Sequence, residues 1–249
     1  MPSLSAAIFA TALGLSHGLT LHVKAGPDGR AIGDCPFAHA IRFAAAAKGL
    51  EMDVVPHSPT SKPTWLVEQY EGKMPCLVDD NQKVVTESRV IANHLEEIYP
   101  MPSLTDSPNL EAAEEAAKPV FMAFARYCKN TDAEHDDELK KALLLALCTL
   151  DAALSKTRPG PYSCGAAPSM ADCFLLPALF HVSIAGKAFK EFEVPPQFES
   201  LHQYMDYAFA TPLFAGCAPA PAMVRWGWAN ARGDEAAAAA AAAECGVMA

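Results

Sequence analysis

Gly33-Asp34-Cys35-Pro36-Phe37 is the stretch of sequence from which the fold can be worked out. Residues 21–23, just before it, are typical of a short strand, and residues 24–32 contain the Gly and Pro of a loop. Residues 38–50, just after it, are rich in Ala, contain no Pro and include Gly49 near their end, which predicts a helix with its C-terminal stop. The stretch therefore leads from a strand and loop into a helix.

Cys35 is the residue of this stretch that could be chemically reactive. Pro36 would occupy the first position of the helix, where a helix tolerates proline best. The Cys35 sulfur would then face unpaired backbone N–H groups and the positive end of the helix dipole, both of which favour the thiolate. At such sites the pKa of a free thiol falls from about 8.5 to roughly 3.5–7.5. We therefore favour a reactive thiol over a buried structural cysteine.

The composition is that of a soluble globular protein. The chain has 249 residues, of which 51% are hydrophobic and 19% charged, and this length suits two modest domains. Its net charge of -10 and its pI of about 5.2 argue against nucleic acid and anionic membrane surfaces as general partners. An anionic small substrate remains compatible with this charge if the site supplies its own cations.

The eight cysteines are scattered along the chain and show no CxxC or Cys/His spacing of a zinc site. We therefore expect no metal centre. A chain of this size does not need disulfides for stability, so we expect mostly free thiols in a reducing compartment. We expect a cytoplasmic protein, with the chloroplast as an alternative.

The N-terminal extension, residues 1–19, leaves two interpretations open. The first 20 residues contain no acidic residue and are rich in Ala, Ser and Leu, as in a targeting peptide, but they lack the basic residues of transit and secretory signals. The apolar run at residues 6–15 is too short to span a bilayer. A loosely packed extension and a plastid-targeting segment both fit this pattern.

A first domain is predicted over residues 20–100 from the order of its elements. After the first strand and helix we expect a strand at 52–55, a loop at 56–63, a helix at 65–70, strands at 76–78 and 83–85, and a helix at 90–99. The order strand, helix, strand, helix, strand, strand, helix is the thioredoxin-like layout. The fold class is therefore α/β in this part of the chain.

The second domain is predicted to be all-helical. It follows a linker at residues 101–104, covers residues 105–232 and precedes a low-complexity tail at 233–249 that we expect to be frayed. Helices are expected at 108–130, 134–155, 173–185 and 198–209. Ser169 and Asp172 fit a capping box before the third of these, which is apolar nearly all round. We interpret it as a buried core helix; a membrane span is the alternative, but the run is short and contains Pro177 and His181.

Taken together, these motifs resemble the glutathione transferase superfamily, and within it the plant-type dehydroascorbate reductases. The motifs are Val23-Lys24-Ala25, residues 33–37, Ser61-Lys62-Pro63-Thr64-Trp65, Glu71-Gly72-Lys73-Met74-Pro75, Glu87-Ser88, residues 95–100, Ser169 to Asp172, Val194-Pro195 and Gly227-Trp228. The chain also resembles the chloride intracellular channel proteins, which share many of these motifs. Asp34, the Glu87-Ser88 pair and the lack of a long acidic insertion between Leu154 and Ser169 favour the reductases. The resemblance implies a glutathione transferase fold.

The resemblance also implies a glutathione site in the first domain. Pro75 would follow a cis peptide bond, and the Met74 backbone would bind the cysteinyl part of glutathione. Glu87 and Ser88 would bind the γ-glutamyl end, and Lys62 the glycine carboxylate. The implied glutathione-binding residues are thus Phe37, Lys62, Met74, Pro75, Glu87 and Ser88.

The catalytic residues implied by the resemblance are Cys35, Asp34 and Lys24. Cys35 would be the nucleophile; because Ala38 stands where a second CxxC cysteine would be, its oxidised form must be resolved by an external thiol, and glutathione fits. Lys24 and Asp34 would bind dehydroascorbate. An aspartate beside the sulfur should raise the thiol pKa, so Asp34 makes more sense as a substrate contact than as an activator.

Two residues of the second domain, His181 and Trp228, either line the open side of the substrate site or pack between helices. His39, one turn into the first helix, is expected to face solvent. We expect glutathione as a co-substrate, no tightly bound cofactor, no nucleic-acid partner, no stable membrane insertion and a monomer.

Three functions compete on this evidence. The first is reduction of dehydroascorbate by glutathione through a ping-pong thiol mechanism at Cys35, with glutathione disulfide as product. The second is glutathione-dependent thiol transfer of the omega type, whose enzymes share the cysteine. The third is a redox-switched membrane protein like the channel group, against which the net charge of -10 argues.

Overall fold

The computed structural model of the protein describes residues 18–157 and 160–246. The predicted N-terminal extension, except for its last two residues, and the end of the predicted tail lie outside the described residues. The limits of the two domains stay predictions.

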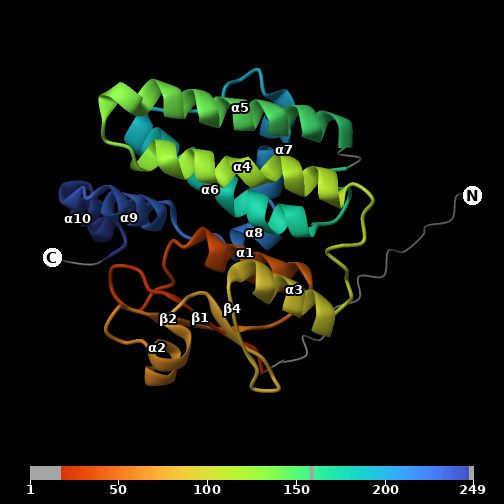
Figure 1. Ribbon diagram of the computed structural model, residues 1–249, viewed down its shortest axis with the longest axis vertical. Helices are drawn as coiled ribbons and strands as arrows, with labels where there is room; N and C mark the ends of the chain where they lie inside the picture. Colours follow the sequence, from red (N-terminus) through yellow and green to blue (C-terminus); the bar gives the residue numbers. More distant parts are fainter. Residues whose placement is uncertain (1–17, 158–159, 247–249) are drawn as a thin grey trace, which may run out of the picture.

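A four-stranded sheet organises the first part of the chain, in the strand order β2-β1-β3-β4. Its strands are β1 (Thr20–Lys24), β2 (Asp53–His57), β3 (Cys76–Val78) and β4 (Val84–Thr86). β1 runs parallel to β2 and antiparallel to β3, which is antiparallel to β4. Helices α1 (Pro36–Ala47) and α3 (Ser88–Ile98) lie between the sheet and the second domain, and α2 (Thr64–Tyr70) lies on the outer side (Figure 1). This confirms the thioredoxin-like layout.

The alternation of side chains along β1 explains why helices cover both faces of the sheet. Leu21 and Val23 are fully buried in the hydrophobic core, where they meet side chains such as Ile41 of α1. His22 points to the opposite face, and its ring lies 5.3 Å from that of Trp65 on α2. The strand that leads to Cys35 is therefore held from both sides.

The helix after Cys35 forms as predicted, whereas the second strand is longer than predicted. α1 begins at Pro36 and is followed by Gly49 with φ 68°, a left-handed conformation that glycine adopts readily. β2 continues through Pro56 to His57 instead of ending at residue 55. Proline is tolerated there because β2 is at the edge of the sheet, where a missing N–H donor leaves no partner unpaired.

The second part of the chain is wholly helical within the described residues. Its helices are α4 (Leu110–Lys129), α5 (Ala133–Thr157), α6 (Met170–Lys190), α7 (Glu199–Phe209), α8 (Pro212–Ala215), α9 (Pro221–Arg232) and α10 (Glu235–Glu244). α4 packs on both α5 and α6, and α6 also packs on α1, which joins the two parts (Figure 1). The predicted combination of an α/β unit with an all-α unit is confirmed.

α6 is the central helix of this second unit. Among the described residues it is the one helix long and apolar enough to cross a membrane, with a mean hydropathy of 1.3 over its most apolar window, but 61% of that window is buried inside the protein. Buried side chains occur all round it, including Leu176, Leu179 and Val182. This burial supports the interpretation as a core helix.

The start of α6 is fixed by the buried carboxylate of Asp172. One of its oxygens accepts hydrogen bonds from the Ser169 N–H and Oγ, both at 2.7 Å. The other accepts from the Ser163 N–H at 2.9 Å and from the Tyr204 hydroxyl at 2.6 Å. The predicted capping pair is therefore part of a larger buried network that also joins α6 to α7.

The alanine-rich tail does not fray as expected. Its described part forms α10, whose N-cap residue Asp234 accepts a hydrogen bond from the Ala237 N–H at 2.9 Å. Ala238 and Ala241 are buried where α10 packs on α9. Alanine has the highest helix propensity, and its small side chain allows this close helix packing.

Candidate active site

Cys35 occupies the N-cap position of α1, with its side chain half-buried. The backbone N–H groups of Phe37 and Ala38 favour the thiolate, as predicted from the helix start. Burial is the larger influence, however, and together with the Asp34 carboxylate it raises the pKa of the Cys35 thiol. The structure therefore contradicts the expected lowering of this pKa.

Lys24 and Asp34 form an ion pair beside the cysteine. The Lys24 Nζ lies 3.4 Å from the Asp34 Oδ1 and 5.0 Å from the centre of the Trp226 ring on α9. The Lys24 side chain is 47% exposed, whereas that of Asp34 is 11% exposed. Burial raises the pKa of Asp34, although the Lys24 ammonium opposes this shift. An accessible cation and a mostly buried acid thus lie next to one thiol.

His181 and Trp228 lie together behind this group. The Trp228 Nε1–H donates a hydrogen bond of 2.8 Å to the His181 Nδ1, so the ring proton of a neutral His181 is on Nε2. Burial lowers the pKa of His181 to about 3, against the opposing influence of the Asp34 backbone. Because both side chains are buried, the structure favours the interpretation as helix packing over an open wall for substrate.

His39 does not face solvent as expected. Its side chain is buried between α1, α6 and α8, with its ring 5.0 Å from that of Phe214 and 6.1 Å from that of Phe180. Burial and the neighbouring His181 hold its pKa well below the usual range, so the ring is neutral. The expectation was wrong because the helix packs its second turn against the second domain.

Two of the segments predicted to bind glutathione have a distinctive backbone. The peptide bond between Met74 and Pro75 is cis, as the resemblance implied. Ser88 is the first residue of α3, and Glu87 before it has φ 68°, a strained value for a residue other than glycine that is often found at functional sites. The α3 N-terminus therefore presents free N–H groups beside a carboxylate.

Two lysines lie beside these segments. The Lys62 Nζ donates a hydrogen bond of 2.8 Å to the Gly72 carbonyl, which holds the amine beside the loop before Met74. The Lys73 Nζ lies 3.9 Å from the Glu87 Oε1. Lys73 was not among the predicted site residues, although its place in the Glu71-Gly72-Lys73 motif next to Met74 was a usable signal.

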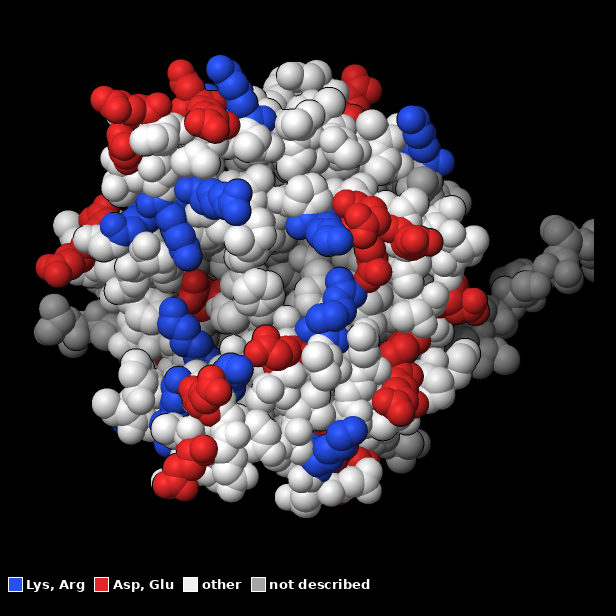
Figure 2. All heavy atoms as spheres, viewed as in Figure 1, with Lys and Arg blue, Asp and Glu red and all other residues white. Residues whose placement is uncertain are grey.

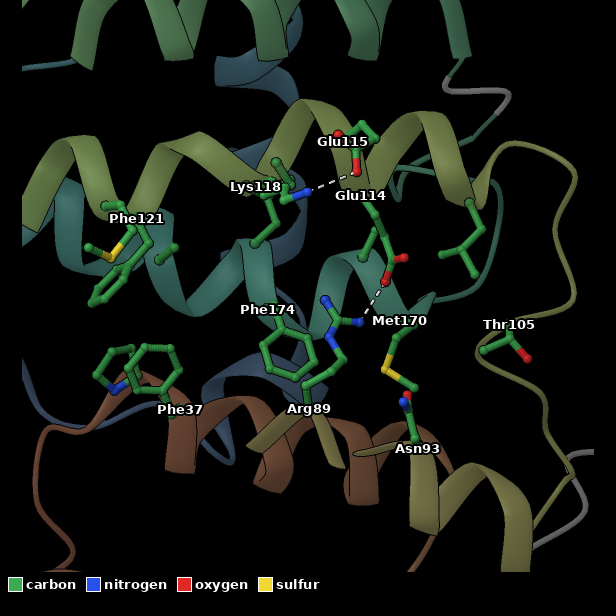
Figure 3. Close-up of a pocket in the computed structure, with 17 residues that line it drawn as sticks. Phe37, Arg89, Asn93, Thr105, Glu114, Glu115, Lys118, Phe121, Met170 and Phe174 are labelled. Atoms are coloured by element: carbon green, nitrogen blue, oxygen red, sulfur yellow. Dashed lines mark hydrogen bonds and ion pairs between the residues drawn. The ribbon is translucent and has the colours of Figure 1, made fainter. Parts of the chain in front are cut away.

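A cavity of about 520 Å³ lies between α1, α3, α4 and α6, and Phe37 forms part of its wall (Figure 3). The Phe37 ring is 5.3 Å from that of Phe121, and the Arg89 guanidinium stacks 4.0 Å from the centre of the Phe174 ring while pairing with Glu114 at 2.6 Å. None of the predicted substrate residues line it. The sequence could not reveal this cavity because four separate helices form its wall.

The charges of the described surface are mixed. On the face seen in Figure 2, Lys and Arg side chains are interspersed with Asp and Glu and form no continuous basic surface.

The eight cysteines are free thiols. Within the described ranges, no group of three His, Cys, Asp or Glu side chains is arranged to hold a metal ion.

Comparison with known proteins places the chain in a family. Residues 31–103 match the N-terminal domain of glutathione S-transferases, and residues 110–206 match their C-terminal domain. The chain is 32% identical to the probable glutathione S-transferase DHAR1, cytosolic, of Oryza sativa subsp. japonica, over 85% of this chain and 97% of that protein. It is 33% identical to glutathione S-transferase DHAR2 of Arabidopsis thaliana, over 79% of this chain and 90% of that protein.

Solved structures give the same result. The crystal structure of Chlamydomonas reinhardtii dehydroascorbate reductase superposes with a TM-score of 0.76 at 30% identity, covering 86% of this chain and 98% of that one. A CLIC homologue from C. elegans superposes with a TM-score of 0.69 at 21% identity, covering 88% and 83%, which shows a shared fold. The resemblance to plant-type dehydroascorbate reductases and the predicted fold are confirmed, and the chain belongs to the glutathione S-transferase family.

Proposed function

We propose that this protein reduces dehydroascorbate to ascorbate with glutathione, using Cys35 as the nucleophile. The observation that carries the proposal is the placement of the Cys35 thiol at a helix N-terminus beside the Lys24–Asp34 pair. An accessible ammonium suits the oxygens of a small oxidised substrate. The dehydroascorbate reductase of Chlamydomonas reinhardtii, matched over most of both chains, supports the same activity, as do the relatives named DHAR1 and DHAR2.

The proposed reaction has three balanced steps. The Cys35 thiol and one water give two electrons and two protons to dehydroascorbate, which leaves as ascorbate, and the sulfur becomes a sulfenic acid. A first glutathione condenses with it, losing water, to form a mixed disulfide. A second glutathione attacks this disulfide, releasing glutathione disulfide and the Cys35 thiol. The net reaction consumes two glutathione molecules for each dehydroascorbate.

Two neighbouring groups would assist the first step. The Lys24 ammonium favours the Cys35 thiolate and would pair with the developing negative charge of ascorbate. Asp34 would bind and orient dehydroascorbate rather than activate the thiol, because its carboxylate disfavours the Cys35 thiolate. Glutathione would bind along Lys62, Met74, Pro75, Glu87 and Ser88, with Phe37 at its border.

Omega-type thiol transfer is the competing activity, because it would need the same cysteine. Parallel initial rates distinguish the two: ascorbate formation from dehydroascorbate and glutathione, and release of glutathione disulfide from a small glutathionyl mixed disulfide. The proposal expects the first to be much faster, with parallel double-reciprocal lines when both substrates are varied. Fast thiol transfer with ascorbate formation at the uncatalysed rate would contradict it.

The remaining parts of the proposal concern the state of the protein. We propose a monomer without a tightly bound cofactor, in the cytoplasm or in the chloroplast, that does not insert stably in membranes. Light scattering after size-exclusion chromatography tests the monomer, and flotation with anionic vesicles under oxidising conditions tests the membrane interpretation. Imaging the full chain with a C-terminal fluorescent tag tests the compartment.

A further inference from the structure

Trp226, Gly227 and Trp228 are consecutive residues of α9, and each contacts a different part of the site beside Cys35. Trp226 lies under the Lys24 ammonium, 5.0 Å from Nζ to the ring centre. Trp228 donates its indole N–H to His181. Gly227, between them, lies directly against the Asp34 carboxylate. One turn of a helix from the second domain thus supports an ion pair that belongs to the first.

Gly227 leaves space that the Asp34 side chain fills. A Cβ atom built on Gly227 would lie 1.7 Å from the Asp34 Oδ2, 2.1 Å from its Cγ and 2.5 Å from its Oδ1. Gly227 is inside α9 and does not have a positive φ, so no unusual backbone conformation requires glycine there. Glycine weakens a helix interior, and the close approach of the carboxylate is the physical reason for its presence here.

α9 is itself fixed, so it can act as a rigid support. Arg232 in its last turn donates hydrogen bonds to the carbonyls of Cys128 and Asn130 at the end of α4. Arg225 pairs with Glu244 of α10. With the Trp228–His181 bond to α6, the helix is held from three directions, and the Lys24–Asp34 pair must adapt to it.

We propose that Trp226 and Gly227 are positioning residues, which fix the Lys24 ammonium and the Asp34 carboxylate beside the Cys35 sulfur. The substrate half of the site is then completed by the second domain. The consequence for dehydroascorbate rests on the proposed function, whereas the contacts themselves are testable without any turnover.

The first experiment measures steady-state kinetics of Trp226→Leu. A cation–π contact at a partly exposed site contributes enough to raise the KM for dehydroascorbate about two- to five-fold when it is lost. The KM for glutathione and the melting temperature should stay unchanged. Trp226→Phe keeps an aromatic ring, so its KM for dehydroascorbate should be close to that of the wild type. Tyr207→Leu, an exposed aromatic residue on α7, is the matched control. An unchanged KM for dehydroascorbate in Trp226→Leu would overturn the role of Trp226.

The second experiment uses Gly227→Ala alone and combined with Asp34→Ala. The added methyl group must displace the Asp34 carboxylate, so Cys35 should react faster with iodoacetamide at neutral pH, since that carboxylate disfavours the thiolate. The loss of melting temperature caused by Gly227→Ala should largely disappear in the Asp34→Ala background. An equal loss in both backgrounds, or an unchanged alkylation rate, would overturn the role of Gly227.

The two proposals can fail separately in these measurements. If the wild-type protein forms no ascorbate, the proposed function fails, but alkylation and melting still test the contact between Gly227 and Asp34. If the wild-type protein is active and both variants behave as the wild type, the function stands and the positioning role fails.

Discussion

Replacing Asp172 with Ala should destabilise the protein strongly, and the structure gives the magnitude. The buried carboxylate accepts from the N–H groups of Ser163 and Ser169 and from the Tyr204 hydroxyl, which keeps its proton because burial raises its pKa well above the usual value. Each buried donor left without an acceptor costs about 1–3 kcal/mol, so the three together cost at least about 3 kcal/mol. For a chain of this size that lowers the melting temperature by at least about 6 °C.

A graded series makes this prediction sharper. Asp172→Asn should be nearly as harmful as Asp172→Ala, because donors face both carboxylate oxygens and the amide NH₂ must point at one set of them. Tyr204→Phe removes one donor and leaves the Ser163 and Ser169 bonds in place, so it should cost only about 1–1.5 kcal/mol. Thermal denaturation followed by circular dichroism measures all three. An Asp172→Asn variant within about 2 °C of the wild type would refute the reasoning.

Three further predictions concern the site. Because burial and Asp34 raise the pKa of the Cys35 thiol above its ordinary value, the rate of Cys35 alkylation should increase throughout the neutral range and level off only in the alkaline range; a plateau below pH 7 would contradict this. Asp34→Asn should speed this alkylation at neutral pH yet slow ascorbate formation, and a faster turnover would argue against its role as a substrate contact. Glu87→Gln should raise the KM for glutathione about ten-fold, since a charged hydrogen bond is lost, with the KM for dehydroascorbate as the internal control.

Features determined by local sequence could be predicted. Cys35 at the start of a helix follows from the strand and loop before it, from Pro36 and from the alanine-rich run that ends at Gly49. The Asp172 capping pair follows from a spacing of three residues. In both cases the interacting groups lie within one helical turn, so the pattern of residues contains the whole contact.

Features that depend on distant packing could not be predicted. The raised pKa of Cys35 results from burial, which outweighs the favourable helix start that the sequence indicates. The burial of His39 depends on α6 and α8, and the contact of Gly227 with Asp34 depends on where α9 docks. The length of β2 was missed because Pro56 is a strand breaker only where its N–H would be needed.

The measurement that tests the central claim most directly is ascorbate formation, followed by its ultraviolet absorbance, from dehydroascorbate and glutathione. The wild type is compared with Cys35→Ser and with Cys148→Ser, which changes an exposed cysteine on α5 as the matched control. The account predicts wild-type rates for Cys148→Ser and only the uncatalysed rate for Cys35→Ser, with the fold intact by circular dichroism. Ascorbate formation by Cys35→Ser at a rate close to that of the wild type would contradict it.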